Sequence, residues 1–173
     1  MKDYKKYYII PASPEEVYAA LTNPATIQLW SGAYAEMSTE PGSEFQLFDD
    51  SIAGKNLEFE ENKMLVQEWY FGEQTEPSIV TIKLHPHKYG TSAELKHTNI
   101  PDEAFEDITE GWNDIYFGSL IAFYEEGWGK YLCLAFVVSQ NGVAVLILKS
   151  INFNKLKFLL PAIKNFYNIY YNC

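Results

Sequence analysis

Arginine is absent from this chain of 173 residues, whose 13 basic side chains are all lysines. Bidentate clamps on phosphates or carboxylates are therefore excluded, because they need the planar guanidinium group. The formal net charge is −10, whereas nucleic-acid binding needs clustered cations. We therefore expect no nucleic-acid partner.

Cysteine is nearly absent as well. Cys133 and Cys173 form neither a C-x-x-C motif nor a metal-ligand spacing, so we expect no disulfide framework. The apolar run before Pro11 is too short for a secretory signal. Together these features predict a protein of the reducing cytoplasm.

Recognisable catalytic motifs are also missing. The sequence has no G-x-S-x-G element and no glycine-rich phosphate loop. His85 and His87 flank Pro86 without a third ligand nearby, and zinc sites need three or four ligands. We expect neither a metal nor a cofactor, and we favour a role other than catalysis.

The longest amphipathic stretch runs from Pro101 to Glu126. Its apolar side chains recur mostly at steps of three or four residues, which predicts one continuous helix. Such a helix can cover the apolar face of a sheet. Acidic side chains crowd its early turns, where they suit the helix dipole and are expected to face solvent. The apolar positions are Phe105, Ile108, Trp112, Ile115, Tyr116, Leu120 and Phe123, and the acidic positions include Glu106, Asp107 and Glu110.

The N-terminal part of the chain predicts one strand and two short helices. Residues 4–10 are rich in β-formers. Ser13 is expected to cap the first helix, because Glu16 completes an S-x-x-E capping box and Pro14 suits the first helical position. A second short helix is predicted over residues 25–30.

About six short strands are predicted before the long helix. Turn residues separate them, and Gly54 inside one of them predicts a bulge or a close backbone approach. Consecutive strands joined by short loops predict an antiparallel sheet, so the fold class is α+β. The predicted strands are 34–38, 44–48, 51–60, 63–71, 78–84 and 91–98, with residues 85–90 as a loop.

An ordered set of residues is distributed over these predicted elements. It comprises Pro14, Val17, Tyr18, Trp30, Gly42, Phe45, Gly54, Trp69, Ser78, Val80, Thr81, Gly90, Thr91, His97, Gly111 and Trp112. With the order of the elements, this set resembles the START-like (SRPBCC) superfamily. Within it, the chain is most similar to the C-terminal domain of the heat-shock-protein-90 ATPase activator and its stand-alone bacterial homologues. The resemblance covers about residues 4–126.

The resemblance implies a helix-grip fold, in which a curved antiparallel sheet of six to seven strands wraps the long C-terminal helix around a cavity. In the wider superfamily such cavities hold lipids, sterols, polyketides or hormones. We expect inward apolar residues to line the cavity, with a few polar groups as anchors. The expected ligand-binding residues are Trp30, Phe45, Gln67, Trp69, Val80, Leu95, His97, Trp112 and Tyr116.

Three functions stay open from the sequence. The favoured one is binding of a small hydrophobic or amphipathic ligand by a monomer or homodimer. The second is a chaperone-interacting regulatory module, which the resemblance implies. The third is a cyclase or hydrolase that uses His97 with Tyr116 or Gln67, although a lone inward histidine is more often a hydrogen-bonded structural residue.

The composition changes sharply after residue 126. Residues 1–126 hold 8 lysines and all 23 acidic residues, a net charge of −15, whereas residues 127–173 hold 5 lysines and no acidic residue. We expect the domain to end at residue 126. For the tail, residues 131–148 predict either a β-hairpin around Asn141-Gly142 or a short membrane-associated segment, and the third possibility is a non-native extension.

Overall fold

A computed structural model of the protein describes residues 1–72 and 76–125. The hairpin, the membrane segment and the extension considered for residues 127–173 lie outside the described residues. Among the described helices, none is both long and apolar enough to cross a membrane.

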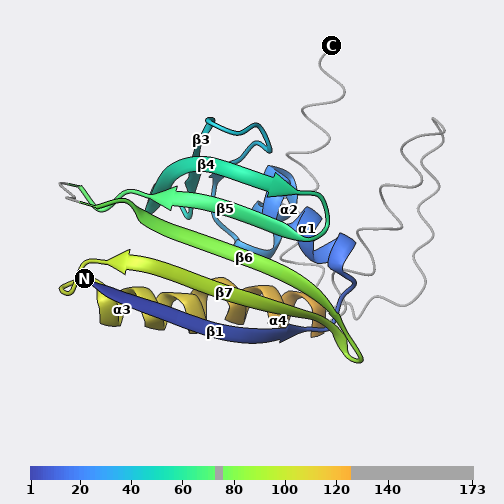
Figure 1. The fold of residues 1–173 in the computed structure, drawn as a ribbon. Helices are drawn as coiled ribbons and strands as arrows, with labels where there is room; N and C mark the ends of the chain where they lie inside the picture. Colours follow the sequence, from blue (N-terminus) through green and yellow to red (C-terminus); the bar gives the residue numbers. More distant parts are fainter. Residues whose placement is uncertain (73–75, 126–173) are drawn as a thin grey trace, which may run out of the picture. The chain divides into compact units, whose positions relative to one another are not determined.

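The central feature is an antiparallel sheet of seven strands in the order β1-β7-β6-β5-β4-β3-β2 (Figure 1). The first strand of the chain therefore pairs with the last one, which places β1 at one edge of the sheet. The α+β class and the antiparallel sheet predicted from the sequence are confirmed. The strands are β1 (Lys2–Ile10), β2 (Ala35–Glu36), β3 (Glu44–Leu47), β4 (Ile52–Glu60), β5 (Met64–Trp69), β6 (Ser78–His87) and β7 (Gly90–Ile100).

Two short helices, α1 (Pro14–Thr22) and α2 (Pro24–Ser31), follow β1. The predicted capping box is confirmed. The Ser13 side chain accepts a hydrogen bond from the Glu16 amide at 3.3 Å, and the Ser13 amide donates to the Glu16 carboxylate at 2.9 Å. These bonds satisfy the backbone N–H groups of Ser13 and Glu16, which the start of a helix otherwise leaves unpaired.

The loop predicted over residues 85–90 is wrong. β6 continues to His87 and β7 begins at Gly90, so that Pro86 stands opposite Thr91 in the hairpin. Gly90 has a φ of +127°, and this backbone conformation lets the chain reverse within a very short turn. The pairing of the two strands therefore persists almost to the tip.

The predicted continuous helix over residues 101–126 is also corrected. It begins at Phe105 and consists of α3 (Phe105–Glu110), a π-helix η1 (Gly111–Tyr116) and α4 (Phe117–Glu125). The wider π turn is closed by the Phe117 amide, which donates to the Trp112 carbonyl five residues earlier. Gly118 fits this turn, because a Cβ atom there would lie 2.7 Å from the Asn113 carbonyl oxygen.

The π turn changes which side chains of the helix are buried. Phe117, which the helical pattern omitted, is 0% exposed. Ile115, which the pattern placed on the apolar face, is 58% exposed. The reason is geometric, since a wider turn brings residues five apart onto one face.

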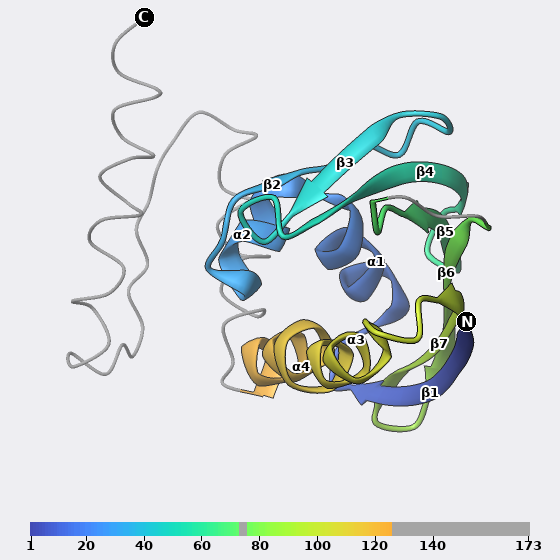
Figure 2. The ribbon, with the colours of Figure 1, turned by 90° about the vertical axis from the view of Figure 1, so that its left-hand side faces the viewer.

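The sheet curves around α1 and the C-terminal helix, as Figure 2 shows. The helix is fastened to the edge strand β1. The Asn113 side chain accepts from the Tyr8 hydroxyl at 2.8 Å, and the rings of Tyr8 and Phe117 stack with centroids 4.0 Å apart. The Tyr124 hydroxyl donates to the Glu16 carbonyl at 3.0 Å. This is the gripped helix that the sequence predicted.

Candidate functional site

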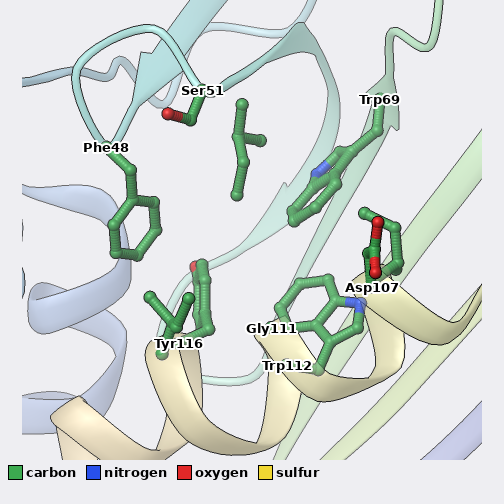
Figure 3. A pocket seen from close by; sticks show the side chains of 10 residues that line it. Phe48, Ser51, Trp69, Asp107, Gly111, Trp112 and Tyr116 are labelled. Atoms are coloured by element: carbon green, nitrogen blue, oxygen red, sulfur yellow. The ribbon is translucent and has the colours of Figure 1, made fainter. Parts of the chain in front are cut away.

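An apolar pocket of about 220 Å³ lies where the C-terminal helix faces β4, β5 and the turn between β3 and β4 (Figure 3). A cavity of about 150 Å³ already holds a molecule the size of benzene. The pocket is therefore large enough for a small aromatic or short aliphatic molecule. Its walls are Phe48, Ser51, Ile52, Trp69, Asp107, Ile108, Gly111, Trp112, Ile115 and Tyr116.

Aromatic rings in mutual contact form much of the wall. Trp69 and Trp112 stack with ring centroids 4.7 Å apart, and Tyr116 tilts against Trp112 at the same distance. Trp112 and Tyr116 both belong to the π-helix. π turns occur often at functional sites, and here the turn brings both rings to the pocket.

The turn between β3 and β4 supplies the opposite wall. Phe48, Asp49 and Asp50 have φ angles of 56°, 53° and 66°, in a region that non-glycine residues rarely adopt. The Tyr34 amide donates to the Asp49 side chain at 2.9 Å and helps to hold this conformation. The Phe48 ring thereby lies 5.8 Å from that of Tyr116, centroid to centroid.

The Tyr116 hydroxyl is the most informative polar group of the pocket. The residue is only 4% exposed, and burial raises the pKa of its phenol well above the usual value. Within the described part of the chain, this hydroxyl has no hydrogen-bond partner. Figure 3 shows it directed into the pocket rather than toward the helix. Buried polar groups are nearly always hydrogen-bonded. A buried hydroxyl without a partner among the described residues is therefore an unused donor and acceptor at the pocket.

His97 lies behind the aromatic wall and not on the pocket surface. Trp112 Nε1 donates to His97 Nδ1 at 3.0 Å, so the ring proton belongs on Nε2, which contacts Ser78 Oγ at 2.9 Å. The Ser78 hydroxyl in turn donates to the Thr98 carbonyl at 3.2 Å. Burial lowers the pKa of His97 to about 3.

Both ring nitrogens of His97 are therefore occupied, and the residue is 0% exposed. General acid or base catalysis needs a nitrogen within hydrogen-bond reach of a substrate. His97 holds Trp112 in place instead, and this geometry gives no support to the cyclase or hydrolase interpretation. Its role is that of a positioning residue behind the pocket.

A second buried network includes Gln67. Trp69 Nε1 donates to Gln67 Oε1 at 3.4 Å, and Gln67 Nε2 donates to Asn56 Oδ1 at 2.9 Å. Asn56 Nδ2 then donates to the Ser38 carbonyl at 3.0 Å. This chain of bonds satisfies Gln67 within the core and orients Trp69, whose ring forms part of the pocket wall.

The structure brings three of the nine expected ligand-binding residues to the pocket, namely Trp69, Trp112 and Tyr116. The other six are buried away from it, so their expected contact with a ligand is a prediction that the structure does not test. They are Trp30, Phe45, Gln67, Val80, Leu95 and His97. Sequence reasoning missed the turn residues Phe48 and Ser51 and did not assign Asp107 to the site.

Fold and pocket together define a START-like helix-grip domain. The profile of the family described as "Activator of Hsp90 ATPase homolog 1-like protein" matches residues 11–132. This chain belongs to that family.

Individual curated proteins are similar to parts of this chain. An uncharacterised protein of Schizosaccharomyces pombe is 37% identical over 67 residues, 39% of this chain and 20% of the relative. The mouse activator of 90 kDa heat shock protein ATPase homolog 2 is 25% identical over 113 residues, 64% of this chain and 34% of the relative. The chain thus spans about a third or less of these curated relatives.

Among solved structures, an HSP90 activator from Plasmodium falciparum superposes with a TM-score of 0.66 at 24% identity. The match covers 72% of this chain and 97% of that one. At this identity the likeness establishes the shared fold.

Proposed function

We propose that this protein binds a small apolar or amphipathic molecule in the pocket between the C-terminal helix and the sheet. The observation that carries the proposal is the buried Tyr116 hydroxyl, which faces a largely apolar pocket and has no hydrogen-bond partner among the described residues. Small-molecule sites commonly combine apolar walls with a few polar groups that orient the ligand.

The energetics of the hydroxyl favour occupancy. An unpaired buried polar group costs about 1–3 kcal/mol, and a ligand oxygen or nitrogen that pairs with Tyr116 recovers that cost. The rings of Trp69 and Trp112 offer flat apolar surface beside it. A ligand with an aromatic or short aliphatic body and one polar atom at its inner end therefore fits the site.

Tyr116→Phe is expected to weaken binding of 4-ethylphenol about 5-fold to 15-fold, the equivalent of roughly 1–1.5 kcal/mol for one hydrogen bond. The folded protein should be no less stable, because the hydroxyl has no hydrogen-bond partner to lose in the described part of the chain. Titration followed by NMR of the Trp69 and Trp112 indole protons measures the affinity. Tyr89→Phe, at a residue 65% exposed and outside the pocket, is the matched control.

Equal affinity of the Tyr116→Phe variant and the parent protein would remove the hydroxyl from the site. Absence of any shift at the Trp69 and Trp112 indoles would contradict the pocket itself. Native mass spectrometry of the purified full-length chain adds an independent check, because a co-purifying small molecule should be displaced by 4-ethylphenol.

A second proposed function is regulation of an Hsp90-type chaperone. The family match and the similarity to the mouse activator of 90 kDa heat shock protein ATPase homolog 2 support it. The acidic surface of residues 1–126, with a net charge of −15, suits a basic partner surface. We expect the purified chaperone to co-precipitate with this protein, and we expect the ATPase rate of the chaperone to rise when this protein is added. An unchanged rate together with no co-precipitation would remove this proposal.

A further inference from the structure

The rim of the pocket carries charge of one sign. Asp107 is the charged residue among those that line it, and neither a lysine nor a histidine does so within the described chain. Figure 3 shows its carboxylate beside Trp69, on the side away from Phe48. The Tyr116 hydroxyl and the Asp107 carboxylate thus mark two different ends of one apolar space.

Among residues 1–72 and 76–125, Asp107 forms no ion pair with a cationic side chain. In the described part of the chain, the ion pairs formed by carboxylates involve Glu60, Glu94 and Asp102 instead. The side chain of Asp107 is exposed to solvent at the rim. It is therefore available to a positive group on a molecule that enters the pocket.

We propose that the pocket selects ligands with a protonated amine at the outer end and a neutral oxygen at the inner end. The amine pairs with Asp107, the oxygen hydrogen-bonds Tyr116, and an aromatic or aliphatic body lies between them against the tryptophans. Carboxylate ligands are disfavoured, because they meet a like charge at the rim and no compensating lysine among the described lining residues. This inference rests on the proposed ligand binding and adds the charge class of the ligand.

The volume of the pocket sets the size of the ligand. Asp107 belongs to α3 and Tyr116 to η1, so the two polar groups lie on different turns of the C-terminal helix. A single aromatic ring with a two-carbon arm is slightly larger than benzene, which a cavity of about 150 Å³ holds. The volume of about 220 Å³ is therefore consistent with a body of that size.

Three probes that share a 4-hydroxyphenyl ring test the inference with the full-length protein. They are 2-(4-hydroxyphenyl)ethylamine, 2-(4-hydroxyphenyl)ethanol and 3-(4-hydroxyphenyl)propanoate, which carry positive, zero and negative charge. We expect the amine to bind about 3-fold to 5-fold more tightly than the alcohol, the upper part of the range for a solvent-exposed ion pair. The propanoate should bind more weakly than the alcohol, and salt should reduce both differences.

Asp107→Asn should bring the three affinities to within about two-fold of each other. Glu106→Gln is the matched control, because it removes one negative charge from the same helix at a residue that does not line the pocket. Thermal unfolding checks that both variants fold. The preference for the amine should persist in Glu106→Gln.

Binding of all three probes with equal affinity to the parent protein would overturn the inference and leave the proposed ligand binding intact. A preference for the amine that survives Asp107→Asn would overturn it as well, since another group would then be its source. If none of the probes binds, the proposed function fails, and this inference fails with it.

Discussion

Lowering the pH from 7 to 5 is expected to remove about 2 kcal/mol of folding stability through His97 alone. The folded protein holds the pKa of His97 at about 3, whereas the ordinary value of 6.5 applies to the unfolded chain. Between these values the unfolded state binds a proton that the folded state refuses. The contribution of His97 to the free energy of unfolding is therefore fully present above pH 6.5, and it is lost steadily as the pH falls toward 3.

The main cause of the lowered pKa is the complete burial of His97, and the hydrogen bond from Trp112 Nε1 to His97 Nδ1 also opposes protonation. A protonated imidazole carries donors on both nitrogens, so Nδ1 would oppose the indole N–H. The buried charge would also lose its hydration, and the charge of Asp3 offsets that loss only in part. Protonation therefore breaks the contact that holds Trp112 against the pocket.

Urea unfolding at pH 7 and pH 5 measures this effect, with His97→Gln as the variant that cannot titrate. The variant should lose about 2 kcal/mol less than the parent protein over the same pH change, because all other groups contribute equally to both. If His97→Gln does not fold, NMR of the His97 imidazole in the parent protein decides the matter. An imidazole that titrates near pH 6.5 in the folded state would contradict the prediction.

Strand alternation was enough to predict that His97 points inward, because residues two apart share a face of a strand. Its chemical role was not predictable in the same way. The partners that fix its tautomer, Ser78 and Trp112, come from another strand and from the C-terminal helix. Pairings between distant elements depend on tertiary geometry that a single sequence does not express.

The C-terminal helix shows where periodicity stops being informative. Steps of three and four residues predict a face but cannot reveal one wider turn inside it. The π turn is accompanied by a tertiary contact, the stacking of Phe117 on Tyr8, which a regular α-helix would place differently. The pattern therefore identified the helix and two of its pocket residues, Trp112 and Tyr116, while misplacing Ile115.

The contribution of the turn between β3 and β4 to the pocket was missed for a different reason. Left-handed backbone conformation is usually marked by glycine, yet Phe48, Asp49 and Asp50 adopt it without one. The sequence shows only two polar residues, Asp49 and Asp50, after a predicted strand. Nothing in that pattern indicates that Phe48 turns back toward Tyr116 to complete the pocket.

Gly54→Ala is expected to destabilise the protein by about 3 kcal/mol or more, or to prevent folding. A Cβ atom at this position would lie 2.0 Å from the Glu68 carbonyl oxygen and 2.8 Å from the Phe45 ring. Gly54 pairs with Trp69 across β4 and β5. The close backbone approach predicted for this glycine from the sequence is confirmed.

Relief of that clash requires movement of backbone or of a buried ring, since neither neighbour is a flexible side-chain end. Separation of β4 from β5 would also displace Trp69 from the pocket wall, so surviving folded protein should bind 4-ethylphenol more weakly. Gly111→Ala is the matched control for stability alone, because Gly111 lines the pocket, but an added methyl group there would meet no atom within 4 Å outside its own stretch of helix. Urea unfolding should show that control to be neutral or more stable by about 0.5–1 kcal/mol. Equal stability of Gly54→Ala and the parent protein would contradict the prediction, because β4 and β5 would then accommodate the added methyl group without a measurable loss of stability.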